Sequence, residues 1–284
     1  MNPISCNGAF NLKYTVESGQ PLTFHSQYSK RDNVEHLEYV TTKGKIEIRL
    51  SNSRLSYLSE GGYTRRSAGK EVMERFGLRD DLQDIYKRIN TDPFMAKAIS
   101  EFRGLRITQN DPWETTLCFI MSQFNNIKRI KGIIQRMIGE FGYEFDGIRL
   151  FPAPEAIAAS DIARIRSCGT GFRDKYIRSA AEQFAHSFNP ERLYGMKYEA
   201  AKESLMELDG IGDKVADCIL LFGYGKKEAF PIDVWIKRVM ERTYFNGRKR
   251  SVQKIHEFAD LRWPGLQGYA QQYLFHYARS RGIK

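Results

Sequence analysis

Hydrophobic and polar positions follow two different patterns along the chain, and the β-type pattern comes first. Phe10 to Val16 alternates apolar and polar residues, as half-buried β-strands do. His36 to Val40 and Lys45 to Leu50 stand on either side of Thr41-Thr42-Lys43-Gly44, which predicts a β-hairpin. We therefore expect residues 8 to about 60 to be rich in strands.

From about Arg65 onward the apolar residues recur at three- and four-residue intervals, which predicts helices. Asp111 and Asp233, each beside or near a proline, are expected to cap two of them. The expected helices cover residues 67–77, 81–89, 93–102, 111–123, 126–141, 172–187, 197–208, 213–223, 233–244, 251–259 and 267–280.

These patterns predict an α+β protein with two domains. A small N-terminal antiparallel β-sheet domain with connecting helices is expected over residues 1–95, and a mostly α-helical domain over residues 96–284. The last helix is free to pack back toward the sheet domain.

The most informative segment runs from Leu205 to Phe222, where helical spacing is interrupted at Gly210-Ile211-Gly212. Two glycines around one apolar residue allow a sharp reversal, after which the first amides of the next helix point outward. Such unpaired amides attract phosphate groups. Lys214 lies in the first turn of that helix, so an amine is expected beside a phosphate-binding hairpin, near the carboxylate of Asp233.

Lys214 and Asp233 suit chemistry at a sugar carbon. A lysine amine attacks only when it is deprotonated, and we expect the helix N-terminus and partial burial to lower the pKa of Lys214. Cap amides are expected to keep Asp233 ionised, and a fixed carboxylate stabilises the oxocarbenium-like sugar that forms when a base leaves C1′. Phosphate binding and helix capping are the structural alternatives for these two residues.

Two loop tips are candidates for DNA contact. In one, Phe124, Asn125 and Asn126 lie between two expected helices, followed by Arg129. In the other, glycines on either side of Thr170 precede the pair Phe172 and Arg173 at a helix start. An exposed aromatic at such a tip can wedge between base pairs, whereas packing into the core is the equally weighted alternative for Phe172.

Composition narrows the choice of partner. The formal net charge of +10 favours a polyanion, without distinguishing DNA from RNA or an acidic membrane. No apolar run reaches the roughly 18 residues of a membrane span, and the first ten residues lack a signal-peptide pattern. We expect a soluble, cytoplasmic monomer, associated with the nucleoid in a prokaryote. The spacing of the four cysteines and five histidines fits no metal motif, so no metal and no cofactor are expected.

The motifs resemble those of the helix-hairpin-helix DNA glycosylase superfamily, base-excision repair enzymes with a hairpin, then a lysine, then an aspartate after a Gly/Pro-rich loop. The order and spacing of SQFNNIKRI, CGTGFRDKYI and LDGIGDKVADCILLF…PIDVW resemble its 8-oxoguanine DNA glycosylase branch, from about residue 10 to 280. The resemblance implies a bifunctional DNA glycosylase/AP lyase that excises 8-oxoguanine from duplex DNA. Lys214 would attack C1′ and form a Schiff base that permits β-elimination, while Asp233 supports charge development.

The resemblance also implies a base pocket. Ser18-Gly19-Gln20 is similar to a motif whose glycine carbonyl accepts the N7–H of the oxidised guanine. By the same resemblance Gln271 reads the Watson–Crick edge, Phe275 stacks on one face of the base, and Cys218 lines the other. Taken singly, each of these residues also fits a structural role as a turn glycine, a surface amide or a core residue.

The chain departs from the family pattern at the DNA-contacting tips. Phe124 replaces the first of three asparagines, the one that fills the gap left by the extruded nucleotide, so stacking with less base discrimination is expected there. Trp235 replaces a histidine that follows the catalytic aspartate, and Phe172 stands where tyrosine is frequent. Arg129 and Arg173, which contact the orphaned cytosine in the family, are retained.

Two other functions compete with this interpretation. An alkylpurine (3-methyladenine-type) DNA glycosylase would share the sheet domain and the aspartate, but these enzymes use water and generally lack the lysine that this chain has at Lys214. A non-catalytic DNA-binding protein would use Gly210 and Gly212 only as a phosphate clamp.

Overall fold

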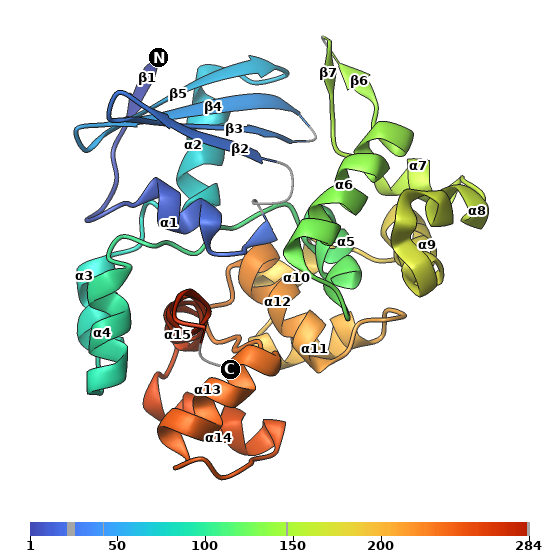
Figure 1. The fold of residues 1–284 in the computed structure, drawn as a ribbon. Helices are drawn as coiled ribbons and strands as arrows, with labels where there is room; N and C mark the ends of the chain where they lie inside the picture. Colours follow the sequence, from blue (N-terminus) through green and yellow to red (C-terminus); the bar gives the residue numbers. More distant parts are fainter. Residues whose placement is uncertain (22–25, 42, 146, 283–284) are drawn as a thin grey trace.

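A computed structural model describes residues 1–21, 26–41, 43–145 and 147–282. An antiparallel sheet of five strands precedes a mostly helical region, as the sequence predicts (Figure 1). The strand order is β1-β5-β4-β3-β2. The strands are β1 (Asn2–Ile4), β2 (Ser26–Arg31), β3 (Val34–Val40), β4 (Gly44–Ser51) and β5 (Arg54–Gly61).

The predicted hairpin is confirmed as β3 and β4, in which Leu37 pairs with Ile48. Thr42, in its predicted turn, lies outside the described residues. Two further hairpins flank it, and both have two-residue loops with positive φ at each position, at Asp32-Asn33 and Asn52-Ser53. That geometry matches the right-handed twist of the strands on either side.

The prediction of a strand from Phe10 to Val16 is wrong, because Leu12–Glu17 forms helix α1. Asn11 caps this helix by accepting a hydrogen bond from the Tyr14 amide at 2.9 Å. Its buried side chains, Leu12, Thr15 and Val16, fall on one helical face. In so short a segment the apolar residues fit both the two-residue period of a strand and the 3.6-residue period of a helix. The Asn11 cap favours the helix.

The helical region follows the predicted spans closely. Its longer helices are α2 (Arg65–Arg75), α3 (Leu82–Ile89), α4 (Pro93–Glu101), α5 (Pro112–Ser122), α6 (Ile127–Phe141), α9 (Asp174–His186), α11 (Tyr198–Met206), α12 (Asp213–Tyr224), α13 (Val234–Tyr244), α14 (Val252–Arg262) and α15 (Gln267–Ser280). The sequence did not predict α7 (Pro154–Ala158), α8 (Ile162–Ile165), η2 (Arg166–Thr170), η3 (Gly171–Arg173), α10 (Arg192–Gly195) or the small hairpin β6 (Glu144–Phe145) and β7 (Ile148–Arg149). Within the described ranges, no helix is both long and apolar enough to cross a membrane.

Two hydrophobic cores organise the molecule. The smaller core lies between the sheet, α1 and α2 and ends at Leu78, and the larger begins at Leu82 in α3 and extends to α15. Helix α15 lies between α4 on one side and α13 on the other (Figure 1). Near its end, Arg279 donates a hydrogen bond to the Ser18 carbonyl, so the last helix contacts the segment after α1. The division at residue 95 proposed from the sequence stays a prediction.

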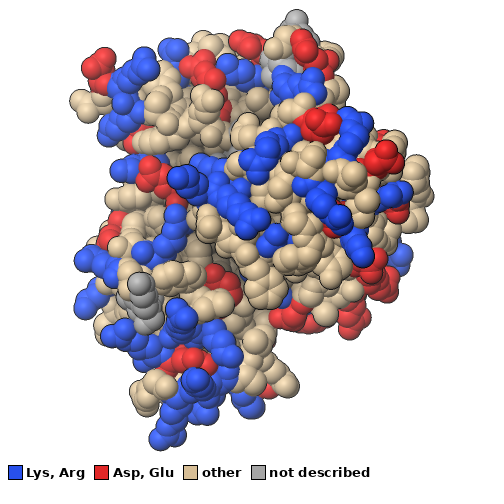
Figure 2. All heavy atoms as spheres, turned by 45° about the vertical axis from the view of Figure 1, so that its right-hand side comes forward, with Lys and Arg blue, Asp and Glu red and all other residues tan. Residues whose placement is uncertain are grey.

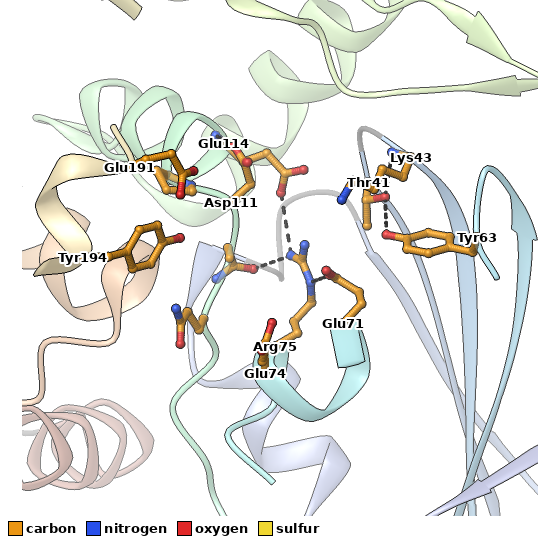
Figure 3. Close-up of a pocket in the computed structure, with 13 residues that line it drawn as sticks. Thr41, Lys43, Tyr63, Glu71, Glu74, Arg75, Asp111, Glu114, Glu191 and Tyr194 are labelled. Atoms are coloured by element: carbon orange, nitrogen blue, oxygen red, sulfur yellow. Dashed lines mark hydrogen bonds and ion pairs between the residues drawn. The ribbon is translucent and has the colours of Figure 1, made fainter. Parts of the chain in front are cut away.

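A buried arginine links the sheet domain to the helical domain. Arg75 of α2 is 3% exposed and donates hydrogen bonds to Glu71 at 2.5 Å and to Asn110 at 2.8 Å (Figure 3). Its Nη1 also lies 3.6 Å from a carboxylate oxygen of Glu114 in α5. These groups border a cavity of about 180 Å³ between the two domains. Burial raises the pKa of Glu114 to about 8, and the Arg75 guanidinium opposes that rise.

We predict that Arg75→Met lowers the free energy of unfolding at pH 9 by about 3–5 kcal/mol, because it leaves the buried Glu114 carboxylate without its cation. The loss should be smaller at pH 5, which is below the raised pKa of Glu114, because a protonated Glu114 needs no counter-charge. Urea denaturation at both pH values measures this.

Arg66→Met on the exposed face of α2 is the matched control, expected to change stability by less than about 0.5 kcal/mol. Equal losses for Arg75→Met at pH 5 and pH 9 would contradict the role given to Glu114.

Candidate active site

The glycine hairpin places Lys214 at the start of α12. Gly210 has φ +80°, and an added Cβ would lie 2.5 Å from the Tyr176 ring, so this position requires glycine. Gly212 is the N-cap of α12 and offers no side-chain hydrogen bond, which leaves first-turn amides for an anion. The Lys214 Nζ lies 3.4 Å from Ser122 Oγ and 5.2 Å from the centre of the Phe119 ring.

Asp233 is the N-cap of α13, as predicted. Its Oδ1 accepts a hydrogen bond from the Ile236 amide at 2.7 Å. Burial raises the pKa of Asp233 above its ordinary value, while the Ile236 amide and the Lys214 ammonium oppose this rise. The cap therefore fixes the direction of the carboxylate. Because the carboxylate is largely buried, its electrostatic interaction with a nearby positive charge is stronger than it would be in water.

All six residues predicted for catalysis and base binding line one cavity of about 70 Å³. Lys214, Asp233 and Cys218 lie on it together with Gly19, Gln271 and Phe275, although they come from four separate parts of the chain. The cavity is completed by Ser18, Phe119, Phe222, Pro231 and Gln272. Sequence reasoning gave none of these five a role in the pocket.

The Gly19 wall is held by the residue that follows it. Gly19 has φ +92°, and a Cβ there would lie 2.8 Å from Arg279 Nη1. Gln20 is buried, and its amide nitrogen donates to Ser18 Oγ and to the Arg106 carbonyl, both at 2.9 Å. Its carbonyl oxygen accepts from the Thr108 amide at 2.6 Å. Gln20 thus fixes the backbone at Gly19. In the sequence, Gln20 stands out only as part of the Ser-Gly-Gln motif, and the pattern does not predict this role.

The opposite walls hold a glutamine and a thiol. The Gln271 Nε2 donates to the Pro231 carbonyl at 3.1 Å, while its Oε1 is buried and has no hydrogen-bond partner among the described residues. Burial raises the pKa of Cys218 to about 12, with the Lys214 charge opposing, so the thiol stays protonated at neutral pH. Phe275 is partly buried at the edge of the larger core.

The two predicted tips meet in space. Phe124 is 92% exposed with φ +47°, Phe172 is 55% exposed, and their ring centres lie 6.4 Å apart. The alternative that Phe172 packs into the core is wrong. Behind Phe124, the Asn125 Nδ2 donates to the Met121 carbonyl, and Asn126 caps α6 by accepting from the Arg129 amide, both at 3.0 Å.

The two arginines of these tips have different surroundings. Arg173 is 3% exposed, and its guanidinium donates to the carbonyls of Gln123, Phe124 and Thr170. The same group lies 4.4 Å from the centre of the Phe172 ring. Arg129, by contrast, is exposed. In this structure Arg173 therefore holds the tip together, whereas Arg129 is free to approach a ligand.

Positive side chains surround the tips and the hairpin. Figure 2 shows lysines and arginines gathered in the middle of the displayed face and on its lower lobe. Lys128 and Arg129 of α6, Lys175 of α9 and Arg238 of α13 are exposed cations. Such a surface binds the DNA backbone without reading its sequence.

Behind Lys214, an ion cluster joins α11, α12 and α14. Lys202 Nζ lies 2.8 Å from Asp213 and 2.9 Å from Asp217, and the other oxygens of the two carboxylates face His256 at 3.4 and 3.6 Å. Asp213, Asp217 and His256 lie close enough together to hold a metal ion. Lys202, however, already supplies positive charge to both carboxylates. The cluster therefore fixes the first turn of α12, which carries Lys214.

Comparisons with known proteins show which family the chain is similar to. Residues 4–116 match the 8-oxoguanine DNA glycosylase N-terminal domain, and residues 117–264 match the HhH-GPD superfamily base excision DNA repair protein model. A probable N-glycosylase/DNA lyase of Methanothermobacter thermautotrophicus is 33% identical over 97% of this chain and 96% of its own. The N-glycosylase/DNA lyase of Saccharomyces cerevisiae is 28% identical over 79% of this chain and 70% of its own.

Among solved structures, the 8-oxoguanine glycosylase/lyase of Clostridium acetobutylicum, in complex with double-stranded DNA containing cytosine opposite 8-oxoG, superposes with a TM-score of 0.85. It is 29% identical and covers 96% of this chain and 93% of its own. The sheet domain, the helical domain and the full-length relatives all point to one family. The chain belongs to the 8-oxoguanine DNA glycosylases of the HhH-GPD superfamily, N-glycosylase/DNA lyases of base excision repair.

Proposed function

We propose that this enzyme excises 8-oxoguanine from duplex DNA with Lys214 as the nucleophile and Asp233 as the charge-stabilising carboxylate. The observation that carries the proposal is the single cavity that both side chains share with Gly19, Gln271 and Phe275. A nucleophile, a carboxylate and groups suited to an oxidised purine converge there, although their chain segments are far apart.

The reaction begins when the damaged nucleotide leaves the stack, because C1′ is inaccessible inside a duplex. The Lys214 amine, once deprotonated, attacks C1′, and the bond from C1′ to the base breaks with its electron pair leaving on the base. The sugar ring then opens to a Schiff base, and loss of a C2′ proton expels the 3′ phosphate. Asp233 stabilises the positive charge that develops on the sugar.

Each wall of the cavity fits one feature of the base. The Gly19 carbonyl accepts the N7–H that oxidation creates, the Gln271 Oε1 accepts from the Watson–Crick edge, and Phe275 stacks opposite the neutral Cys218 thiol. Phe124 and Phe172 fill the opened duplex by stacking, and the exposed cations hold the phosphates. The DNA partner is a duplex that contains an oxidised purine, and the enzyme acts as a monomer.

Lys214→Gln should abolish the Schiff base, because it replaces the amine by a neutral amide on a side chain that is only one atom shorter. With borohydride and an 8-oxoguanine duplex, the wild type should form a covalent enzyme–DNA adduct that denaturing gels detect, and the variant should form none. Lys197→Gln, which changes an exposed lysine outside the cavity, is the matched control and should still be trapped. Undiminished trapping with Lys214→Gln would refute the assignment of the nucleophile.

Asp233→Asn should slow base release roughly 100-fold or more, because a fixed negative charge facing the sugar is lost. Asparagine caps helices as well as aspartate does, so folding and DNA affinity should change little. Single-turnover excision and fluorescence anisotropy measure the two effects. An unchanged rate of base release in Asp233→Asn would contradict the role given to this carboxylate.

Phe124→Ala should weaken binding of 8-oxoguanine duplexes about 5- to 150-fold, because stacking contributes roughly 1–3 kcal/mol per base. The loss should be similar for all four bases opposite the lesion, because a ring face does not distinguish them. Phe145→Ala, an exposed phenylalanine of β6, is the matched control and should have no effect. A loss confined to cytosine would show that Phe124 reads the opposite base.

A further inference from the structure

A second glutamine in the base cavity has no assigned role. Gln272 follows Gln271 on α15, lines the same cavity and is 3% exposed. Its Nε2 has no hydrogen-bond partner among the residues that the structure describes. A buried amide donor without a partner costs about 1–3 kcal/mol, and nearly all buried donors have one. This group therefore requires a specific explanation.

The other buried glutamines do not share this feature. The amide nitrogen of Gln20 donates to Arg106, that of Gln267 to Asp260 at 3.0 Å, and that of Gln271 to Pro231. Gln272 is thus the exception among the buried glutamines, and it is the one beside the proposed base-reading residue.

The adjacent residue supplies the complementary group. Because the Gln271 Nε2 is held by the Pro231 carbonyl, its buried Oε1 is the end left without a partner. Two neighbouring residues that line the same cavity therefore each have one amide atom without a partner among the described residues, an acceptor on Gln271 and a donor on Gln272. A guanine-type base offers the matching pair on its Watson–Crick edge, an N1–H donor next to the O6 acceptor. An adenine-type base offers the reverse, an N1 acceptor next to an amino donor.

We propose that Gln272 is a specificity-determining residue whose Nε2 donates a hydrogen bond to O6 of the extruded base, while Gln271 accepts from N1–H. The inference rests on the proposed function, since it needs the base to occupy this cavity. The pair then favours 6-oxopurines, and it rejects 6-aminopurines because donors would face donors and acceptors would face acceptors.

The test compares 8-oxoguanine with its 6-thio analogue, in which a weak sulfur acceptor replaces O6. The wild type should excise the analogue roughly 10-fold more slowly, a loss within the range expected for one hydrogen bond. Gln272→Met should excise 8-oxoguanine roughly 10-fold more slowly than wild type and should lose most of its discrimination between the two bases. Single-turnover rates on matched duplexes measure both effects.

Three controls separate recognition from general damage. Gln272→Met should slow cleavage of a preformed abasic site much less than it slows excision of 8-oxoguanine, because the abasic substrate has no base. Gln267→Met removes an equally buried amide of the same helix outside the cavity and should keep the wild-type discrimination. Gln272→Glu keeps the shape, replaces the donor by an acceptor and should also lose discrimination, which covers the case that the methionine variant folds poorly.

Wild-type discrimination retained in Gln272→Met or Gln272→Glu would overturn the inference and leave the proposed function intact. Failure of the wild type to release 8-oxoguanine at all would overturn the proposed function itself, and the inference with it.

Discussion

The geometry of the active site depends on how α15 is seated. From Gln267 to Leu274 every residue of this helix is buried, and several of them are polar. Tyr269 donates to Asp80 at 2.7 Å, and Tyr273 donates to the Leu105 carbonyl at 2.9 Å. A buried polar group without a partner is costly, so only one rotation and one height of the helix satisfy all these bonds together. In this position of the helix, Gln271, Gln272 and Phe275 line the cavity.

The chemistry is placed by two helix starts rather than by long side chains reaching across space. The glycine hairpin begins α12 with Lys214 in its first turn, and the Asp233 cap begins α13. Both helices carry the positive end of their dipoles toward the site, where phosphates and a carboxylate are stabilised. The ion cluster of Lys202 fixes the first turns of α12 from behind.

The sequence was most informative where the local structure depends on the residues of a single segment. Long helices with aspartate caps were predicted to within a few residues, because period and cap agree. Phe10 to Val16 was misread since both periods fit. Strands β2 and β5 lie in the stretch that was expected to be rich in strands, but they were given no bounds, because their turns need positive φ at residues such as Asn33, which hydrophobic spacing does not signal. The proximity of Lys214 and Asp233 followed from their motif and spacing.

The partners of side chains were not predictable in the same way, because they depend on contacts between distant segments. The free donor of Gln272 exists only because α15 meets α12 and the segment at Gly19, and no local pattern distinguishes it from Gln267. The buried state of Arg173 likewise requires Gln123, which is 50 positions away in the chain.

The buried Arg173 explains how a phenylalanine can occupy position 124. A phenylalanine with φ +47° is strained, at a cost of roughly 1–3 kcal/mol. The guanidinium of Arg173 donates to the carbonyls of Gln123 and Phe124, and hydrogen bonds from a charged donor are strong enough to offset that strain. An arginine whose donors are bound to backbone carbonyls has few left for a base edge. Arg173 therefore positions the two exposed rings of Phe124 and Phe172, whereas Arg129 is exposed to solvent.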